Sequence, residues 1–260
     1  MIPVVFIHRG NQDYFKAVVK QSSARNPVMV IGDSDPGNCS FFNISNYYES
    51  ATEFEKNYEN LSTNGTNSEL ICFSRWFILK DFMERNDIPI IFHLDTDVLF
   101  FDNAEKEWEK FKQFDFTLSH HCCGNNSFFT LHGLKEFCDF TQFIYRNKSS
   151  YEYEKIASHY YIRQKHGLPG GVCDMTLLEF FSYKNCGKIG EMMHIINDST
   201  YDHNINESDQ GFRMSSKGIK EISFKNNIPF CFSDYLKKSI QFKALHFQGG
   251  AKRFLLEYLK

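Results

Sequence analysis

Short apolar runs alternate with longer amphipathic stretches through the first third of the chain. The runs at residues 4–7, 28–31 and 88–94 are rich in Val, Ile and Phe, which is typical of strands buried on both faces of a sheet. Helices are expected between them, at residues 12–24, 46–59 and 68–86, whereas residues 36–45 and 62–67 have an irregular, turn-rich pattern. The chain therefore opens with a β-loop-α-β unit, which predicts the α/β fold class.

The pattern continues with alternating elements in the rest of the chain. Helices are predicted at residues 103–114, 134–146, 151–165 and 174–181, and short strands at 116–118, 128–131, 222–224, 229–232 and just before His246. Residues 197–209 form a polar loop, which is either a mobile lid or a surface excursion. No internal repeat is visible, and 260 residues suit a single domain.

Composition excludes some classes of partner and location. The net charge of −3 and the scattered basic residues give no positive field for a nucleic acid. The amino-terminal residues lack the features of a signal peptide, and no apolar run approaches the length of a transmembrane segment. Four of the eight cysteines, Cys72, Cys138, Cys173 and Cys231, lie in apolar segments, as reduced thiols do. We therefore expect a cytoplasmic protein.

The strand predicted at residues 88–94 ends in two carboxylates, Asp95 and Asp97. Two acids separated by one residue at the end of a buried strand must face a cleft, a cation or both. Mn²⁺ and Mg²⁺ prefer such oxygen ligands and often bind a substrate phosphate at the same time. The sequence therefore predicts a divalent metal site here.

A second group of possible metal ligands is the run from His120 to Cys123, which reads His-His-Cys-Cys. Zinc sites space their ligands so that the side chains converge, and four consecutive side chains splay apart. We therefore expect a strand end or a loop near the site rather than a zinc centre.

Gly170 and Gly171 precede Asp174, which falls in the first turn of a predicted helix. The glycines allow a close backbone approach, and Asp174 is either a helix-dipole partner or an acid that binds or deprotonates an acceptor hydroxyl. Arg75 lies in the predicted helix 68–86, which precedes the strand that ends in Asp95 and Asp97, and it is either a surface residue or a contact to a phosphate or ribose.

Near the carboxyl end, His246 follows a short apolar strand and precedes Gly249, Gly250 and Lys252. The glycines offer backbone amides, and the lysine offers a positive charge. This combination suits a diphosphate cradle beside a metal ligand.

The two motifs together resemble those of a known family. A buried strand that ends in DxD and a carboxyl-terminal HxxGxxK look like the metal and diphosphate motifs of GT-A-fold, nucleotide-sugar-dependent glycosyltransferases, and the second is most similar to that of the GT8-like retaining enzymes. The resemblance implies a single Rossmann-like GT-A domain over residues 1–260, with a mixed, mostly parallel sheet flanked by helices. Its nucleotide-binding part would be about 1–102, and its acceptor-binding and carboxyl-terminal metal and diphosphate part about 103–260.

Site roles follow from the resemblance residue by residue. Asp97 and His246 would ligate Mn²⁺ or Mg²⁺, with Asp95 binding the metal or the donor. Asp174, with Gly170 and Gly171, would lie on the acceptor side. Together with Arg75, the predicted donor-binding residues are His8, Arg9, Asp33, Asp95, Gly249, Gly250 and Lys252.

The implied activity is transfer of a hexosyl or pentosyl group from a UDP-sugar to a hydroxyl of a glycan or another acceptor. The carboxyl-terminal motif favours retention of configuration, and inversion with Asp174 as the base stays open. A metal-dependent phosphohydrolase would need a nucleophile or a second metal site. A non-catalytic nucleotide- or carbohydrate-binding module would have no reason to keep Asp97, His246 and Lys252 together.

Overall fold

The computed structural model describes residues 1–260 and is built around a seven-stranded sheet. Its order is β3-β2-β1-β4-β7-β6-β8, with four parallel pairings, while β7 runs antiparallel to β4 and β6. The strands are β1 (Val4–His8), β2 (Val28–Gly32), β3 (Ser40–Asn43), β4 (Ile90–Leu94), β6 (Phe116–Leu118), β7 (Asn126–Thr130) and β8 (Ile189–Glu191). The expected mixed, mostly parallel sheet is confirmed.

Helices cover both faces of this sheet because its strands are apolar on both sides. In β1, Val4 and Phe6 face one hydrophobic core and Val5 faces the other, and all three are fully buried. The helices are α1 (Asp13–Ser23), α2 (Glu49–Glu55), α3 (Thr66–Arg85), α4 (Ala104–Trp108), α5 (Leu131–Arg146), α6 (Tyr151–Lys165) and α7 (Asp174–Lys184). Residues of α1 and α4 belong to the first core, and residues of α2, α3, α5, α6 and α7 to the second.

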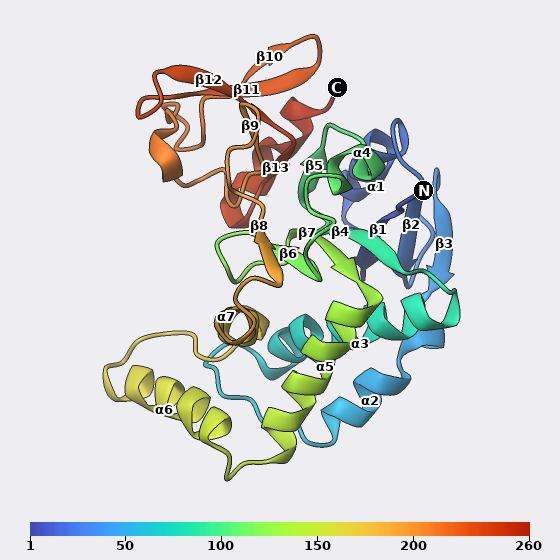
Figure 1. The fold of residues 1–260 in the computed structure, drawn as a ribbon, viewed down its shortest axis with the longest axis vertical. Coiled ribbons are helices and arrows are strands. Elements are labelled where there is room, and N and C mark those ends of the chain that lie inside the picture. The colour runs from blue at the N-terminus through green and yellow to red at the C-terminus, as the bar shows by residue number, and fades with distance from the viewer.

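Two smaller sheets complete the molecule. The four-stranded sheet has the order β10-β11-β12-β9, and β13 pairs antiparallel with β5. Figure 1 shows the four-stranded sheet at the opposite end of the molecule from α6. The strands are β5 (Val98–Phe100), β9 (Ser199–Thr200), β10 (Ser223–Lys225), β11 (Ile228–Ser233), β12 (Lys238–Phe242) and β13 (Ala244–His246), and 3-10 helices span Ile44–Tyr47, Asp209–Gly211 and Gly249–Tyr258.

Several expected elements need correction. Residues 36–45 are not irregular throughout, because they contain β3, an edge strand whose side chains are exposed or half-buried and so lack an apolar run. The helix expected at 46–59 is a 3-10 turn followed by the short α2, and that expected at 103–114 ends at Trp108. The third expected strand starts at Ile90 rather than Ile88. The helix α6 has the predicted bounds.

The polar segment 197–209 is neither a lid nor a surface excursion. It contributes β9 to the small sheet, and Tyr201, Asp202 and Ile205 are each at most 3% exposed. Hydrogen bonds tie this segment to β13, so it forms part of the frame around His246. None of the helices in the chain combines the length and apolar character that crossing a membrane requires.

Candidate active site

The predicted metal ligands meet at the carboxyl end of β4. Asp95 and Asp97 follow that strand directly, and the pairing of β13 with β5 places His246 opposite Val98. One ligand atom from each of Asp95, Asp97 and His246 lies within 4.8 Å of the others, and we call these three residues the metal group. Two carboxylates and an imidazole form a ligand set that suits Mn²⁺ or Mg²⁺ better than a soft cation.

The imidazole of His246 is fixed through Nδ1, and its Nε2 faces Asp97. Its Nδ1 lies 2.5 Å from the carbonyl oxygen of His203, and its Nε2 lies 3.4 Å from Asp97 Oδ1. A hydrogen bond from Nδ1–H to a carbonyl sets the tautomer in which Nε2 can ligate a metal. Burial opposes protonation, but the hydrogen bond and charge of Asp97 outweigh it and raise the pKa of His246 to about 9 in the metal-free protein.

Asn125 supports the fit of a cation at this position. Its amide nitrogen lies 3.1 Å from the His203 carbonyl oxygen and 2.6 Å from His246 Nδ1, whereas its buried Oδ1 has no hydrogen-bond partner. A buried amide oxygen that lacks a donor can accept a hydrogen bond from a water molecule in the cavity that Asn125 lines, including a water bound to a cation. The donors present therefore fit a divalent metal.

Arg75 links the metal group to α7. Its Nη1 lies 2.6 Å from Asp95 Oδ1 and its Nη2 lies 2.6 Å from Asp174 Oδ2, while its guanidinium stacks 4.4 Å from the centre of the Trp76 ring. Although burial opposes ionisation of Asp95, the positive charge of Arg75 lowers the pKa of this carboxyl. Arg75 is thus held within the site rather than on the open surface.

Both carboxylate oxygens of Asp174 are already engaged. Oδ2 accepts hydrogen bonds from Arg75 and from Trp76 Nε1, and Oδ1 accepts one from the Met175 amide. Asp174 is 3% exposed and does not line the cavity that holds the metal group. Its direct partner in the structure is therefore Arg75.

Gly170 and Gly171 pack against the segment that precedes α3. The carbonyl oxygen of Gly170 accepts a hydrogen bond from the Thr63 amide, and a Cβ atom on Gly171, whose φ is +159°, would lie 2.2 Å from the carbonyl oxygen of Leu61. A glycine is required at this close approach of two backbones. Neither glycine lines the cavity around the metal group.

A cavity of about 220 Å³ contains the metal group and reaches Lys252. Lys252 Nζ lies 3.1 Å from Asp97 Oδ2, and the 3-10 helix that starts at Gly249 brings the lysine to this position. The residues that line this cavity are Arg75, Asp95, Asp97, Cys123, Gly124, Asn125, Met175, His203, His246, Gln248 and Lys252. The lining residues that were not predicted are Gly124, Asn125, Met175, His203 and Gln248. Gln248 stands at a variable position of HxxGxxK, and no sequence motif marks the others.

Three of the predicted donor-binding residues, His8, Arg9 and Asp33, lie at the same edge of the sheet, at the ends of β1 and β2. His8 stacks on Phe15 with ring centres 3.8 Å apart and lines a separate cavity of about 330 Å³. Asp33 accepts hydrogen bonds from the Gly10 amide at 3.0 and 3.2 Å, which shapes the loop after β1, and Arg9 is exposed. The structure therefore places these residues near β4 without bringing them into the metal cavity.

The His-His-Cys-Cys run does not converge into a zinc centre. His121 Nδ1 lies 3.2 Å from Glu191, whereas the ring of His120 stacks on His203 with centres 5.3 Å apart. Only the thiols of Cys122 and Cys123 lie close together, with sulfur atoms 3.5 Å apart. The run forms a tight turn beside the metal cavity.

A second group of possible metal ligands occurs at the opposite edge of the sheet, where β6 begins. It consists of Asp115, His132 and Glu136, and Lys188 already approaches both carboxylates at 3.9 and 3.6 Å. This group is too far along the strand direction to share a substrate with Asp95. It offers no second metal for chemistry at the cavity.

Comparison with known proteins finds likeness in structure but not in sequence. No family model matches the chain, and no curated protein matches it. The chain is similar to mouse xyloside xylosyltransferase 1 in its apo form, with a TM-score of 0.51 and 10% identity over 76% of this chain and 87% of that one. The galactosyltransferase LgtC, in complex with donor and acceptor sugar analogs, matches with a TM-score of 0.47 and 12% identity over 99% of this chain and 95% of that one. The first likeness confirms the fold expected from the sequence: this chain has the α/β fold of GT-A glycosyltransferases.

Proposed function

We propose that this protein is a metal-dependent glycosyltransferase that takes a sugar from a nucleotide-sugar donor. The observation that carries the proposal is the meeting of Asp95, Asp97 and His246 with Lys252 in one cavity at the carboxyl end of the sheet. Ligands commonly bind at this edge of an open α/β sheet. The fold shared with a xylosyltransferase supports the same activity.

The donor diphosphate is the group that these residues would bind. A divalent ion held by Asp95, Asp97 and His246 would supply positive charge to the leaving nucleoside diphosphate. Lys252 now faces Asp97 alone and is half-exposed, so its ammonium can turn to a phosphate oxygen without leaving a buried charge unpaired. The amides of Gly249 and Gly250 precede it and would complete the cradle.

The nucleoside would extend toward the cavity beside β1. His8 lines that cavity, and Arg9 next to it is exposed. Asp33 accepts hydrogen bonds from the Gly10 amide and so fixes the loop that follows β1. We infer that the base is uracil from the motifs, and UDP is therefore the first nucleotide to test. Mn²⁺ is the first metal to test.

The acceptor would approach from the other side of the metal group. A cavity of about 480 Å³ lies between α6 and α7 and shares Met175 with the metal cavity. Phe180 and Tyr183 line it beside His159, and aromatic faces suit the apolar faces of sugar rings. A hydroxyl bound near Met175 would lie between the two cavities.

We propose retention of configuration, with Asp174 acting on substrate through Arg75. A general base must reach the proton that it removes, and both oxygens of Asp174 accept hydrogen bonds from protein donors. In a retaining transfer the leaving phosphate can itself accept the proton, so no base is required on the opposite face. Inversion, with Asp174 freed from Arg75 in the bound state, is the second candidate.

Thermal stability with and without ligands tests the proposal. A ligand that binds only the folded protein raises its melting temperature. We expect a shift with UDP or a UDP-sugar that depends on Mn²⁺, and loss of the shift in Asp97→Asn. The matched control is Asp139→Asn, which changes an exposed acid on α5.

Product analysis then separates the alternatives. Release of nucleoside diphosphate with a glycosylated acceptor supports the transferase, release of inorganic phosphate supports a phosphohydrolase, and binding without turnover supports a binding module. Absence of any metal-dependent nucleotide binding would refute the proposed site. The cytoplasmic location expected from the cysteines stays a prediction.

A further inference from the structure

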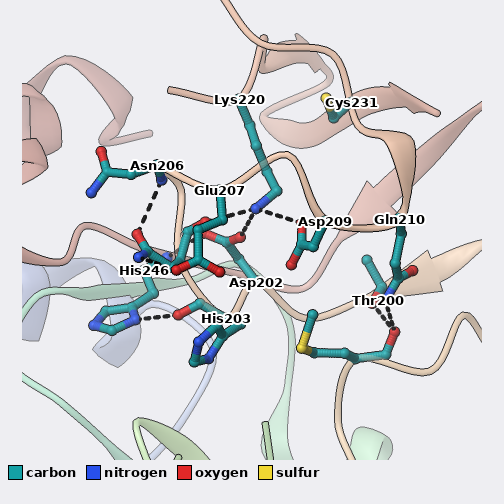
Figure 2. Close-up of polar contacts among 12 residues, drawn as sticks. Thr200, Asp202, His203, Asn206, Glu207, Asp209, Gln210, Lys220, Cys231 and His246 are labelled. Carbon is teal, nitrogen blue, oxygen red and sulfur yellow. Dashed lines mark hydrogen bonds and ion pairs between the residues drawn. The ribbon is translucent and has the colours of Figure 1, made fainter. Parts of the chain in front are cut away.

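Lys220 is a fully buried cation that is surrounded by three oxygen atoms. Its Nζ lies 2.8 Å from Asp202 Oδ1, 2.9 Å from Asp209 Oδ1 and 2.7 Å from the carbonyl oxygen of Asn204. Figure 2 shows the lysine side chain descending from the small-sheet region into this group. The contacts with Asp202 and Asn204 are hydrogen bonds, whereas Asp209 Oδ1 forms an ion pair and accepts no hydrogen bond. The side chain lines none of the cavities described above.

A buried ion centre of this kind adds little net stability, because removing the charges from water offsets most of their attraction. Its presence is better explained by the geometry that it imposes. The residues that Lys220 fixes are Asp202 and Asn204, and its own backbone amide donates to the Ile205 carbonyl at 2.8 Å. The segment 202–205 is therefore anchored by both the side chain and the backbone of one residue.

The same segment holds His246 from three directions. Asp202 Oδ2 accepts a hydrogen bond from the His246 amide at 3.0 Å, and the Ile205 amide donates to the His246 carbonyl oxygen at 3.0 Å. The carbonyl oxygen of His203 accepts from the imidazole Nδ1 at 2.5 Å (Figure 2). Thus the backbone and the ring of the metal ligand are both oriented by residues 202–205.

We propose that Lys220 is a positioning residue for the metal centre, which fixes residues 202–205 so that His246 presents Nε2 to the metal. The proposal rests on the metal site of the proposed function. Asp202 is the direct link, because one of its oxygens binds Lys220 and the other binds the His246 amide. Loss of the lysine would leave this carboxylate without its cation and free the segment to shift.

Lys220→Met and the matched control Lys243→Met test this role. Lys243 is also buried and also pairs with two carboxylates, those of Asp102 and Glu107, but these partners do not contact His246. Free Mn²⁺ is measured by electron paramagnetic resonance during titration of each variant, at a temperature where all are folded. We expect Lys220→Met to weaken Mn²⁺ binding about 10- to 100-fold, the usual effect of losing an outer-shell partner. Lys243→Met should keep Mn²⁺ affinity within about twofold while lowering the melting temperature.

The double variant Lys220→Met/Asp202→Asn guards against a single variant that does not fold. It removes the Lys220 charge together with that of Asp202, so Asp202 is no longer an orphan carboxylate, and Asp209, whose side chain is 18% exposed, keeps a charge that solvent can screen. We expect the double variant to show the same loss of Mn²⁺ affinity, because the anchor is still missing.

Each outcome of the titration decides one claim. Wild-type protein that binds no Mn²⁺ would overturn the proposed function, and the positioning role with it. Wild-type binding that is kept in the double variant, or lost equally in Lys243→Met, would overturn the positioning role alone.

Discussion

Replacement of Arg75 by methionine removes the guanidinium that joins Asp95 to Asp174. Two ion pairs of 2.6 Å are lost, and the Asp174 side chain, only 4% exposed, keeps hydrogen bonds from Trp76 and the Met175 amide alone. Loss of one partner of a buried ion pair lowers the free energy of unfolding by about 3–5 kcal/mol. The Asp95 side chain is 28% exposed, so solvent screens its share and most of the loss comes from Asp174.

For a domain of this size, each kcal/mol shifts the melting temperature by about 2–4 °C, so Arg75→Met should lower it by roughly 6–20 °C. Scanning calorimetry measures the change. In Arg75→Met/Asp174→Asn the buried charge is gone, and about half of the lost stability should return. A melting temperature of Arg75→Met within about 2 °C of wild type would refute the assignment of a buried, stabilising link.

The same variants test whether Asp174 is a base or acts through Arg75. A general base contributes about 100- to 10,000-fold to kcat. If Asp174 acts through Arg75, Asp174→Asn and Arg75→Met should lower kcat by similar factors, and the double variant should be no slower than either. If the factor by which the double variant lowers kcat equals the product of the factors for the two single variants, Asp174 has its own catalytic role.

Three further outcomes are expected. Gly171→Ala should lower the free energy of unfolding by about 1–3 kcal/mol in urea denaturation, because its Cβ would meet the Leu61 carbonyl. Gly250→Ala, whose Cβ would meet no atom within 4 Å, should change it by less than about 0.5 kcal/mol, and equal effects would contradict the close approach. Lys252→Met should weaken Mn²⁺-dependent UDP binding about tenfold or more by calorimetry, with unchanged UDP affinity as the contrary result. Because the pKa of His246 is raised from 6.5 to about 9, its protonation stabilises the metal-free protein fully below pH 6.5, and this contribution is lost as the pH rises through 9. Mn²⁺ must displace that proton, so the Mn²⁺ affinity should rise by up to about tenfold per pH unit to pH 9. An Mn²⁺ affinity that stays constant from pH 7 to 9 would exclude the linkage.

The diacid was accessible to sequence reasoning because a local pattern fixes its place. An apolar strand that ends in Asp95 and Asp97 puts both at the carboxyl edge of the sheet whatever the rest of the chain does. His246 was found through a motif, and its meeting with the diacid depends on the pairing of β13 with β5. That pairing could be expected only from the resemblance.

The partners of these residues were beyond the reach of a local pattern. Asn125 and His203 reach the site from a turn and from a polar loop, and each contacts His246 across a long stretch of chain. Asp174 was visible as an acid after two glycines, but the sequence does not show that Arg75, 99 residues away, occupies it. The missed strands β3, β5, β8, β9 and β12 are two to five residues long, and exposed or half-buried side chains break the apolar runs of β3, β8 and β12.

At the proposed metal site, the pairing of β13 with β5 would make metal binding a late event in the folding of the chain. During synthesis Asp95 and Asp97 leave the ribosome early, whereas His246 emerges only after the whole small sheet. A nascent chain that has reached β12 carries both carboxylates but neither the imidazole nor Lys252. Such a chain can order its parallel strands, but it cannot yet close the ligand set around an ion. Bound metal would therefore report that the carboxyl-terminal strands have reached their native register.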